Sequence, residues 1–230
     1  MTIAPLNENA ALVSFGNVIT LETNRRVVAL HHALRQHPFD GFVESVPAYS
    51  SLAVFYNPLR VPRANPNAAT AFGQVEILIE ALLNETALPD TQAPVSVEIP
   101  VLYDGEDLTA VAAFHGQTVE DTIALHVANT YRVFMIGFLP GFAYLGTLDD
   151  RLATPRRATP RTAVPPGSVG IAGHQTGIYP SASPGGWQLI GRTPFSIFSP
   201  HRQPPCLLSP GDSVRFYAID REEFNSRHEH

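Results

Sequence analysis

Proline and glycine are concentrated in one stretch of this chain, and that stretch limits what the chain can fold into. Residues 137–211 contain 12 of the 21 prolines, 11 of the 16 glycines and the single tryptophan. Because proline lacks a backbone donor and glycine readily adopts left-handed backbone, a segment this rich in both cannot form a regular helix. Aromatic and branched residues, in which disordered segments are poor, are spread through it. The stretch therefore predicts an ordered, turn-rich β region.

Positive charge is concentrated in the same stretch. It holds six arginines and two acidic residues, whereas the whole chain has a net charge of −6. The arginine guanidinium is a planar, permanently charged fork that suits carboxylate and phosphate groups. One arginine alone is typical of a solvated surface, but a local excess among aromatic residues and glycines predicts a site for a small anionic ligand.

The chain has no lysine, since all 15 of its basic residues are arginine. It therefore cannot supply the lysine of a Walker-A or protein-kinase site, a Schiff-base lysine or a biotinylated lysine. We expect any ATP or biotin chemistry to be shared with a partner chain, with no lysine-linked cofactor and no covalent biotin on this one. The net negative charge also argues against sequence-independent binding of nucleic acid.

The sequence favours a cytoplasmic protein without a membrane segment. No apolar run approaches the roughly 20 residues of a membrane-spanning helix. Residues 1–10 lack the basic region of a signal peptide. The single cysteine, Cys206, fits a reducing compartment.

Residues 1–90 are predicted to form a small α+β domain, ferredoxin-like in its order of elements. The expected elements are a strand over 11–15, a helix from its N-cap Thr20 to about His37, strands over 41–47 and 51–56, and a helix whose apolar residues run from Val75 to Leu83. Residues 86–94 are short, polar and contain two prolines, so they predict the domain boundary.

Residues 91–220 are predicted to form a mainly-β barrel, because short strands alternate with Gly/Pro turns. The expected elements are strands over 95–101, 131–138, 189–190, 196–199 and 214–218, and helices over about 106–115 and 119–128. Pro100 places the first of these strands at an edge or a bulge. Thr118 and Asp121 predict a capping box. Residues 221–230 are polar and are predicted to be a frayed tail.

No familiar catalytic or metal-binding signature is present. The histidines lack a recognisable ligand spacing, so no metal site is expected. Gln175 lies between Gly173 and Gly177, where a ligand can approach the backbone closely. His126 lies near the central strand and is a candidate general acid or base, with a core-edge histidine as the alternative. The other candidate residues are polar or aromatic groups among the turns: Tyr144, Arg156, Arg157, Arg161, His174, Tyr179, Ser183 and Trp187. For Tyr144 and Trp187 alone, barrel core is the alternative interpretation.

Several long motifs in this region resemble one known family. They are Gly137-Phe138-Leu139-Pro140-Gly141-Phe142, Tyr144-Leu145-Gly146, Thr154-Pro155-Arg156-Arg157, Ala172-Gly173-His174-Gln175-Thr176-Gly177-Ile178-Tyr179-Pro180 and Ser183-Pro184-Gly185-Gly186-Trp187. The chain resembles the KipI family, also called allophanate hydrolase subunit 1, the B subunit of 5-oxoprolinase, or carboxyltransferase subdomain C and D. Ala143 and His174 depart from the family's usual residues.

This resemblance implies an α+β N-terminal domain followed by a cyclophilin-like β-barrel. It also implies a heteromeric, ATP-hydrolysing enzyme that opens 5-oxo-L-proline to L-glutamate. The implied partners are a sister chain of related carboxyltransferase fold (the C subunit) and a separate A subunit. In that setting Arg157 and Gln175, with His126, are the expected catalytic residues, and the remaining candidates are expected to bind substrate. ATP would be shared with the partner chains, and the chain alone would be inactive.

Two further functions fit the same resemblance. Related domains form the carboxyltransferase part of biotin-dependent urea carboxylase, so a component acting on a urea-like or allophanate substrate is one alternative. A non-catalytic inhibitor of a sensor histidine kinase is the other. The barrel is compatible with all three, and neighbouring genes for a biotin carboxylase or for a histidine kinase would favour the second or the third.

Overall fold

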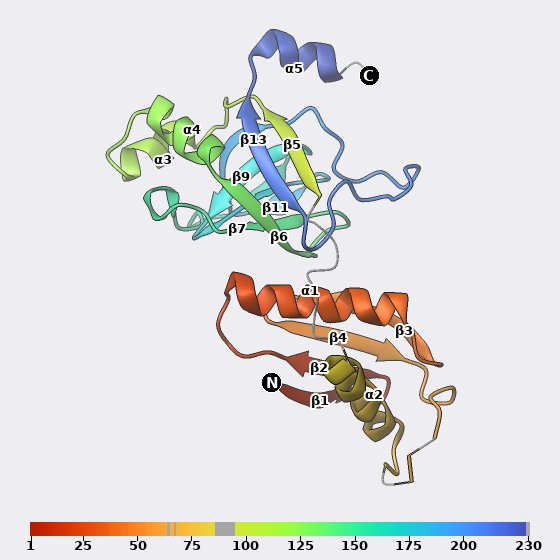
Figure 1. The fold of residues 1–230 in the computed structure, drawn as a ribbon. Coiled ribbons are helices and arrows are strands. Elements are labelled where there is room, and N and C mark those ends of the chain that lie inside the picture. Colours follow the sequence, from red (N-terminus) through yellow and green to blue (C-terminus); the bar gives the residue numbers. More distant parts are fainter. Residues whose placement is uncertain (64, 67, 86–94, 229–230) are drawn as a thin grey trace. The chain divides into compact units, whose positions relative to one another are not determined.

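The computed structural model describes residues 1–63, 65–66, 68–85 and 95–228. The chain divides into two compact units, Met1–Ala93 and Pro94–His230, each described by itself (Figure 1). The boundary predicted at residues 86–94 lies outside the described residues. No helix within the described ranges is long and apolar enough to cross a membrane.

The N-terminal unit is an antiparallel four-stranded sheet in the order β1-β2-β4-β3, with two helices packed on it. Its elements are β1 (Thr2–Asn7), β2 (Ala10–Ser14), α1 (Leu21–Gln36), β3 (Phe42–Pro47), β4 (Ser51–Tyr56) and α2 (Ala71–Glu85). Helix α1 begins where the sequence predicts, because the Thr20 hydroxyl accepts a hydrogen bond from the Thr23 N–H at 3.1 Å. The sequence does not predict strand β1, since its residues are almost all exposed and show no apolar alternation.

The C-terminal unit is built on a mixed seven-stranded sheet in the order β12-β9-β10-β7-β6-β13-β5. Its strands are β5 (Ser96–Val101), β6 (Thr130–Ile136), β7 (Ala143–Gly146), β8 (Arg161–Val164), β9 (Ser168–Ala172), β10 (Gln175–Ile178), β11 (Ser183–Gly185), β12 (Gln188–Arg192) and β13 (Ser213–Ala218). Its helices are α3 (Leu108–Phe114), α4 (Val119–Ala128), the short 3-10 helix η1 (Asp150–Leu152) and α5 (Arg221–His228).

The two edge strands of the seven-stranded sheet approach each other, so the sheet curls into a half-barrel. Leu102, just after β5, and Arg192, at the end of β12, form an antiparallel bridge with both backbone hydrogen bonds at 2.9 Å. Gly105 permits this approach, because a Cβ there would overlap the carbonyl oxygen of Leu189. Among the described strands, β5 pairs with β13 alone, in parallel, so of the two positions predicted from Pro100, an edge or a bulge, the strand takes the edge. An α+β unit followed by a mainly-β unit confirms the predicted fold class.

Side chains on neighbouring strands alternate between two clusters, which we name by their place on the sheet. The inner core lies under α3 and α4 and contains Leu145, Ile171, Ile178 and Ile190. The aromatic face consists of the neighbouring residues in the same strands and turns: Phe142, Tyr144, Val164, Ala172, Tyr179, Trp187 and Leu189, with Leu139 packed beside them. The small two-stranded sheet of β8 and β11 lies next to the aromatic face.

Two predictions about the end of the chain are wrong. Residues 196–199 do not form a strand and contribute only an isolated bridge between Phe198 and Cys206. Residues 221–228 form helix α5 instead of a frayed tail. Phe224 is buried against Leu102, which anchors the helix, and Asp104 accepts a hydrogen bond from Arg221 at 2.8 Å. One apolar anchor in an otherwise polar segment is too weak a pattern to predict this docking.

Candidate functional site

The segment over residues 154–160 carries Arg156 and leads into β8. Two hydrogen bonds hold it on either side of that arginine. The side-chain amide of Gln188 donates to the Pro155 carbonyl at 2.9 Å, and the Arg157 N–H donates to the Gly186 carbonyl at 2.8 Å. Because Gly186 and Gln188 flank Trp187, these bonds hold Arg156 beside the aromatic face.

Arg157 and Arg161 are bound to one buried carboxylate. Asp107, whose side chain is 6% exposed, accepts hydrogen bonds from Arg157 Nη1 at 2.8 Å and from Arg161 Nη2 at 2.7 Å. It also accepts from the Leu189 N–H at 2.7 Å. Arg161 has a second partner in the exposed Glu106, at 3.1 Å. The two positive charges are therefore matched by two carboxylates of the same chain.

Arg156 differs from both of these arginines. Its side chain is exposed, and it makes no hydrogen bond or ion pair with any residue in the described ranges. Its charge acts on two aromatic hydroxyls. Burial raises the pKa of Tyr144, and the Arg156 charge opposes that rise. Burial likewise raises the pKa of Tyr179, where a hydrogen bond with the Trp187 backbone and the Arg156 charge oppose it. Arg156 is thus an exposed cation at the edge of a buried aromatic cluster.

The aromatic face is a set of rings in edge-to-face contact. Phe142 lies at the centre, with ring centroids 4.9 Å from Tyr144, 5.3 Å from Tyr179 and 5.4 Å from Trp187. Such tilted pairs are the favoured arrangement of aromatic side chains. Gly177 makes room for them, because a Cβ there would lie 3.1 Å from the Trp187 ring and 3.2 Å from Phe142. The rings form a tightly packed cluster beside the Arg156 cation, in which Phe142, Tyr179 and Trp187 are buried and Tyr144 is half-buried.

Gln175 lies on the same face of the sheet as the aromatic rings. Side chains alternate along β10, so Gln175 and Gly177 share a face, and Gly177 is paired with Tyr144 in β7. His174 precedes it in the β9–β10 turn, where its Nδ1 is 3.3 Å from Oδ1 of Asp150, and both side chains are exposed. An amide and an arginine therefore both lie beside the rings.

The structure brings most of the predicted site residues together. Ser183 in β11 pairs with Val164 in β8, and its side chain is buried. The predicted residues on or beside the aromatic face are Tyr144, Arg156, Arg157, Arg161, Gln175, Tyr179, Ser183 and Trp187. Among them, only Arg156 combines a full charge with the absence of a partner in the described part of the chain.

His126 lies elsewhere and does not fit the predicted acid–base role. It is completely buried in the inner core, stacked on Phe216 with ring centroids 4.7 Å apart. Its Nδ1 is 2.7 Å from the Tyr103 hydroxyl, and its Nε2 is 3.0 Å from Oγ1 of Thr176. Burial lowers the pKa of His126 to about 3, so the ring is neutral near pH 7. It is a satisfied core histidine, which is the alternative interpretation of its sequence position.

The hydrogen bonds around His126 define its tautomer. The Thr176 hydroxyl donates to the Gly170 carbonyl at 3.1 Å, so it accepts the proton carried by His126 Nε2. The unprotonated Nδ1 then accepts from the Tyr103 hydroxyl. Burial raises the pKa of Tyr103, which keeps that hydroxyl protonated as a donor. Every polar atom of the ring is used within the core.

Two residues of this region do not stand out in the sequence. Asp107 directly precedes helix α3, and an acidic residue at that position suggests a helix cap. In the structure its side chain makes no cap hydrogen bond to α3. Phe138, in the turn after β6, is the non-glycine residue with positive φ (71°) in the described chain, and it is 63% exposed. A bulky residue in left-handed backbone is strained, and sequence alone does not show backbone conformation.

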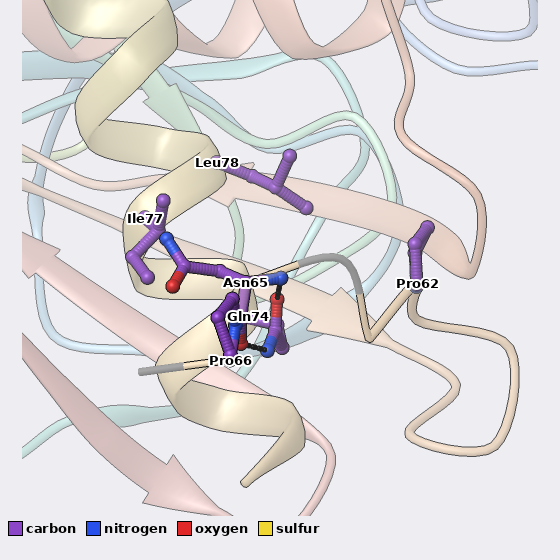
Figure 2. Close-up of a pocket in the computed structure, with 6 residues that line it drawn as sticks. All are labelled: Pro62, Asn65, Pro66, Gln74, Ile77 and Leu78. Carbon is purple, nitrogen blue, oxygen red and sulfur yellow. Dashed lines mark hydrogen bonds between the residues drawn. The ribbon is translucent and has the colours of Figure 1, made fainter. Parts of the chain in front are cut away.

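A pocket of about 340 Å³ lies in the N-terminal unit (Figure 2). It is lined by Pro62, Asn65, Pro66, Gln74, Ile77 and Leu78. The amide of Gln74 donates to the Asn65 carbonyl at 2.6 Å and its oxygen accepts from the Asn65 N–H at 3.1 Å, so its polar group is used in holding the loop. None of the predicted site residues lines this pocket. Within the described residues, no group of three or more His, Cys, Asp or Glu side chains is placed to hold a metal ion.

Comparison with known proteins gives four findings. The family described as "Carboxyltransferase domain, subdomain C and D" matches residues 1–208. The B subunit of 5-oxoprolinase from Bacillus subtilis (strain 168) is 41% identical over 228 residues, which cover 97% of this chain and 95% of that protein. The solved structure of the protein TTHA0988 is 42% identical with a TM-score of 0.80, covering 92% of this chain and 40% of that one. The Kluyveromyces lactis urea carboxylase is 20% identical and shows the same fold, with a TM-score of 0.70 over 97% of this chain and 22% of that one.

Proposed function

The chain belongs to the family of carboxyltransferase subdomains C and D, and from this premise we propose that it is the B subunit of a heteromeric, ATP-dependent 5-oxoprolinase. The reaction opens the lactam ring of 5-oxo-L-proline to L-glutamate. One observation carries this proposal: the identity to the B subunit of a 5-oxoprolinase extends over almost the full length of both chains. The single cysteine fits a cytoplasmic location for such a protein.

The role proposed for this chain is to bind and orient the substrate at the aromatic face. The substrate is a small flat ring with one carboxylate. The half-buried ring of Tyr144, packed against the buried Trp187, offers an apolar contact, Arg156 offers a cation, and the amide of Gln175 offers a donor and an acceptor for the lactam. Arg157 and Arg161 hold the segment in place through Asp107 instead of contacting the substrate. His174, in the β9–β10 turn, and Ser183, in β11, lie at the margins of the aromatic face.

The residues of this chain do not fit the phosphate groups of ATP. A nucleotide triphosphate needs several cationic groups, commonly a lysine and Mg²⁺ beside arginines. The chain has no lysine, and Arg157 and Arg161 are already neutralised by Asp107 and Glu106. We therefore propose that ATP binds to the partner chains, which are a C-type sister subunit of carboxyltransferase fold and an A-type subunit.

The experiment that tests this function is a reconstitution. The chain is assayed for ATP hydrolysis that depends on 5-oxoproline, first alone and then mixed with the A and C subunits from the same organism. Activity is expected only in the complete mixture, and the omission of any one chain should abolish it. If ATP hydrolysis in the complete mixture does not respond to 5-oxoproline, the proposal is wrong.

A second candidate function is a carboxyltransferase component acting on a urea-like substrate. The family description and the fold shared with a urea carboxylase favour it. The two functions differ in their requirement for biotin. A mixture that consumes ATP and bicarbonate with urea, and only when a biotinylated partner is present, would support this candidate over the first.

A further inference from the structure

Arg156, Arg157 and Arg161 lie within six residues of each other but differ in their ion pairs. Arg157 and Arg161 each bind the buried Asp107. The Arg161 side chain is only 13% exposed and is paired with two carboxylates, so it is not accessible to a ligand. Arg156, one position before Arg157, has no partner in the described part of the chain. A cluster that looks like a triply charged anion site in the sequence has one available charge in the structure.

The free arginine is fixed at its backbone. The Gln188 amide binds the carbonyl before Arg156 and the Gly186 carbonyl binds the N–H after it, at 2.9 and 2.8 Å. Both bonds are to neighbours of Trp187, and Arg161 Nη1 donates to the Trp187 carbonyl at 3.3 Å. The backbone of Arg156 is thereby held at the tryptophan, so that only its side-chain torsions have to be ordered on binding. This arrangement is typical of a positioned ligand contact.

From this arrangement we infer that Arg156 is the single arginine of this chain that pairs with the carboxylate of the ligand, and that the site selects a small monoanionic acid over a neutral or polyphosphate ligand. The inference deepens the proposed function and rests on it only for the identity of the acid as 5-oxoproline. Asp107 is a positioning residue, because it withdraws two arginines from the site and fixes the segment on which Arg156 is carried.

The charges around this segment decide between a monoanion and a polyphosphate. Asp107 and Glu106 offset Arg157 and Arg161, which leaves one net positive charge beside the half-buried ring of Tyr144 and the buried rings packed behind it. One guanidinium pairs with one carboxylate through two parallel hydrogen bonds. A triphosphate brought to the same place would add charge that no residue of the described segment matches, at a cost that grows as water is excluded.

Trp187 provides the probe for a direct test. It is the only tryptophan of the chain, so its indole N–H gives a single identifiable signal in a ¹⁵N spectrum of the full-length protein. The full chain is titrated separately with 5-oxoproline, with 2-pyrrolidinone and with ATP plus Mg²⁺. 2-Pyrrolidinone is the same lactam ring without the carboxylate. The titrations are repeated with Arg156→Ala and with Arg215→Ala, which removes an equal charge from β13.

We expect the Arg156 side chain and the carboxylate of 5-oxoproline to be energetically coupled. In the natural chain 5-oxoproline should bind at least about tenfold more tightly than 2-pyrrolidinone, the factor of one charge-assisted hydrogen bond. In Arg156→Ala the two compounds should bind with similar affinity, whereas Arg215→Ala should keep the difference. ATP should leave the Trp187 signal unchanged.

Three results would overturn the inference: no preference for the carboxylate, a preference that survives in Arg156→Ala, or a shift of the Trp187 signal by ATP. Its failure is distinguishable from failure of the proposed function. If the reconstituted mixture does not hydrolyse ATP with 5-oxoproline but Arg156 still couples to the carboxylate, the function is wrong and the acid site stands. If the mixture is active but no coupling is found, the function stands and this inference does not.

Discussion

The inner core and the aromatic face lie on opposite sides of the same strands, yet they differ in whether their polar groups have partners within the protein. In the inner core, His126 has both ring nitrogens hydrogen-bonded, and Tyr131 donates to its carbonyl at 2.9 Å. On the aromatic face, Arg156 is charged and has no partner in the described part of the chain. A satisfied buried group stabilises a fold, whereas an exposed charge without a protein partner is available to a ligand.

This contrast separates residues of similar chemistry by their surroundings. A histidine is the usual candidate for proton transfer, but here it is sealed in the core and its pKa is lowered to about 3 by burial. Three arginines within six residues look equivalent in the sequence, but two of them are used by Asp107. The proposed ligand contact therefore rests on the one of these arginines that has no partner in the described part of the chain.

The largest effect on stability is expected from Asp107→Ala. The substitution leaves Arg161 without its buried partner and the Leu189 N–H without an acceptor. Breaking a buried ion pair from one side costs about 3 to 5 kcal/mol of unfolding free energy. Chemical denaturation of the full chain measures this. Glu106→Ala is the matched control, because Glu106 binds the same arginine but is 73% exposed, and it should cost less than about 1 kcal/mol. Equal effects of the two substitutions would contradict the structural role of Asp107.

A smaller loss is expected from His126→Phe, which keeps an aromatic ring against Phe216 but removes two hydrogen bonds. We expect about 1 to 3 kcal/mol, because the Tyr103 and Thr176 hydroxyls lose a buried partner. If the variant keeps its stability but the reconstituted enzyme loses turnover, His126 acts in catalysis and the contrast between the two faces is wrong.

The same variant should change how stability depends on pH. The pKa of His126 is about 3 in the folded chain and 6.5 in the unfolded chain, so the unfolded state binds the proton first as the pH falls. This group's contribution to stability is full above pH 6.5 and is lost as the pH falls from 6.5 towards 3, by about 1.4 kcal/mol per pH unit. The advantage in unfolding free energy of the natural chain over His126→Phe should therefore shrink as the pH falls and change sign before pH 3, because the loss exceeds about 3 kcal/mol. A constant difference would show that the histidine is not held neutral.

A smaller difference in unfolding free energy, about 1 kcal/mol, is expected between two variants of the turn after β6. Phe138 has left-handed backbone at a φ of 71°. Phe138→Gly and Phe138→Ala both remove the ring, so their difference reports the backbone alone. The glycine variant should be more stable by about 1 kcal/mol, because only glycine adopts this conformation without a Cβ penalty. Equal melting temperatures would mean that the turn relaxes when the ring is removed.

Local signals in the sequence predict local structure well. The Thr20 cap and the start of α1 are confirmed, as is the capping box in which Thr118 and Asp121 exchange hydrogen bonds at the start of α4. The period-two pattern from Val95 to Val101 and the position of Pro100 correctly predict an edge strand. These features depend on residues within a few positions of each other, which is why they can be recognised without the fold.

Long-range pairing is beyond what the sequence predicts. Arg157 and Asp107 are 50 positions apart, as are His126 and Thr176, and no local pattern joins either pair. The sequence therefore indicates that arginines gather in this region but not which of them stays free. Strands β8 and β11 are not predicted for a related reason. They are four and three residues long, and among the described strands each pairs with the other alone.

Arg156→Ala should have the smallest effect on stability of these substitutions. It is also the most direct test of whether this arginine binds the carboxylate. The side chain has no partner to lose in the described part of the chain, so the unfolding free energy should change by less than about 0.5 kcal/mol. The measurement is the KM for 5-oxoproline of the reconstituted enzyme that carries this substitution. We predict a KM raised at least about tenfold at unchanged stability. A KM equal to that of the natural enzyme would contradict the role of Arg156.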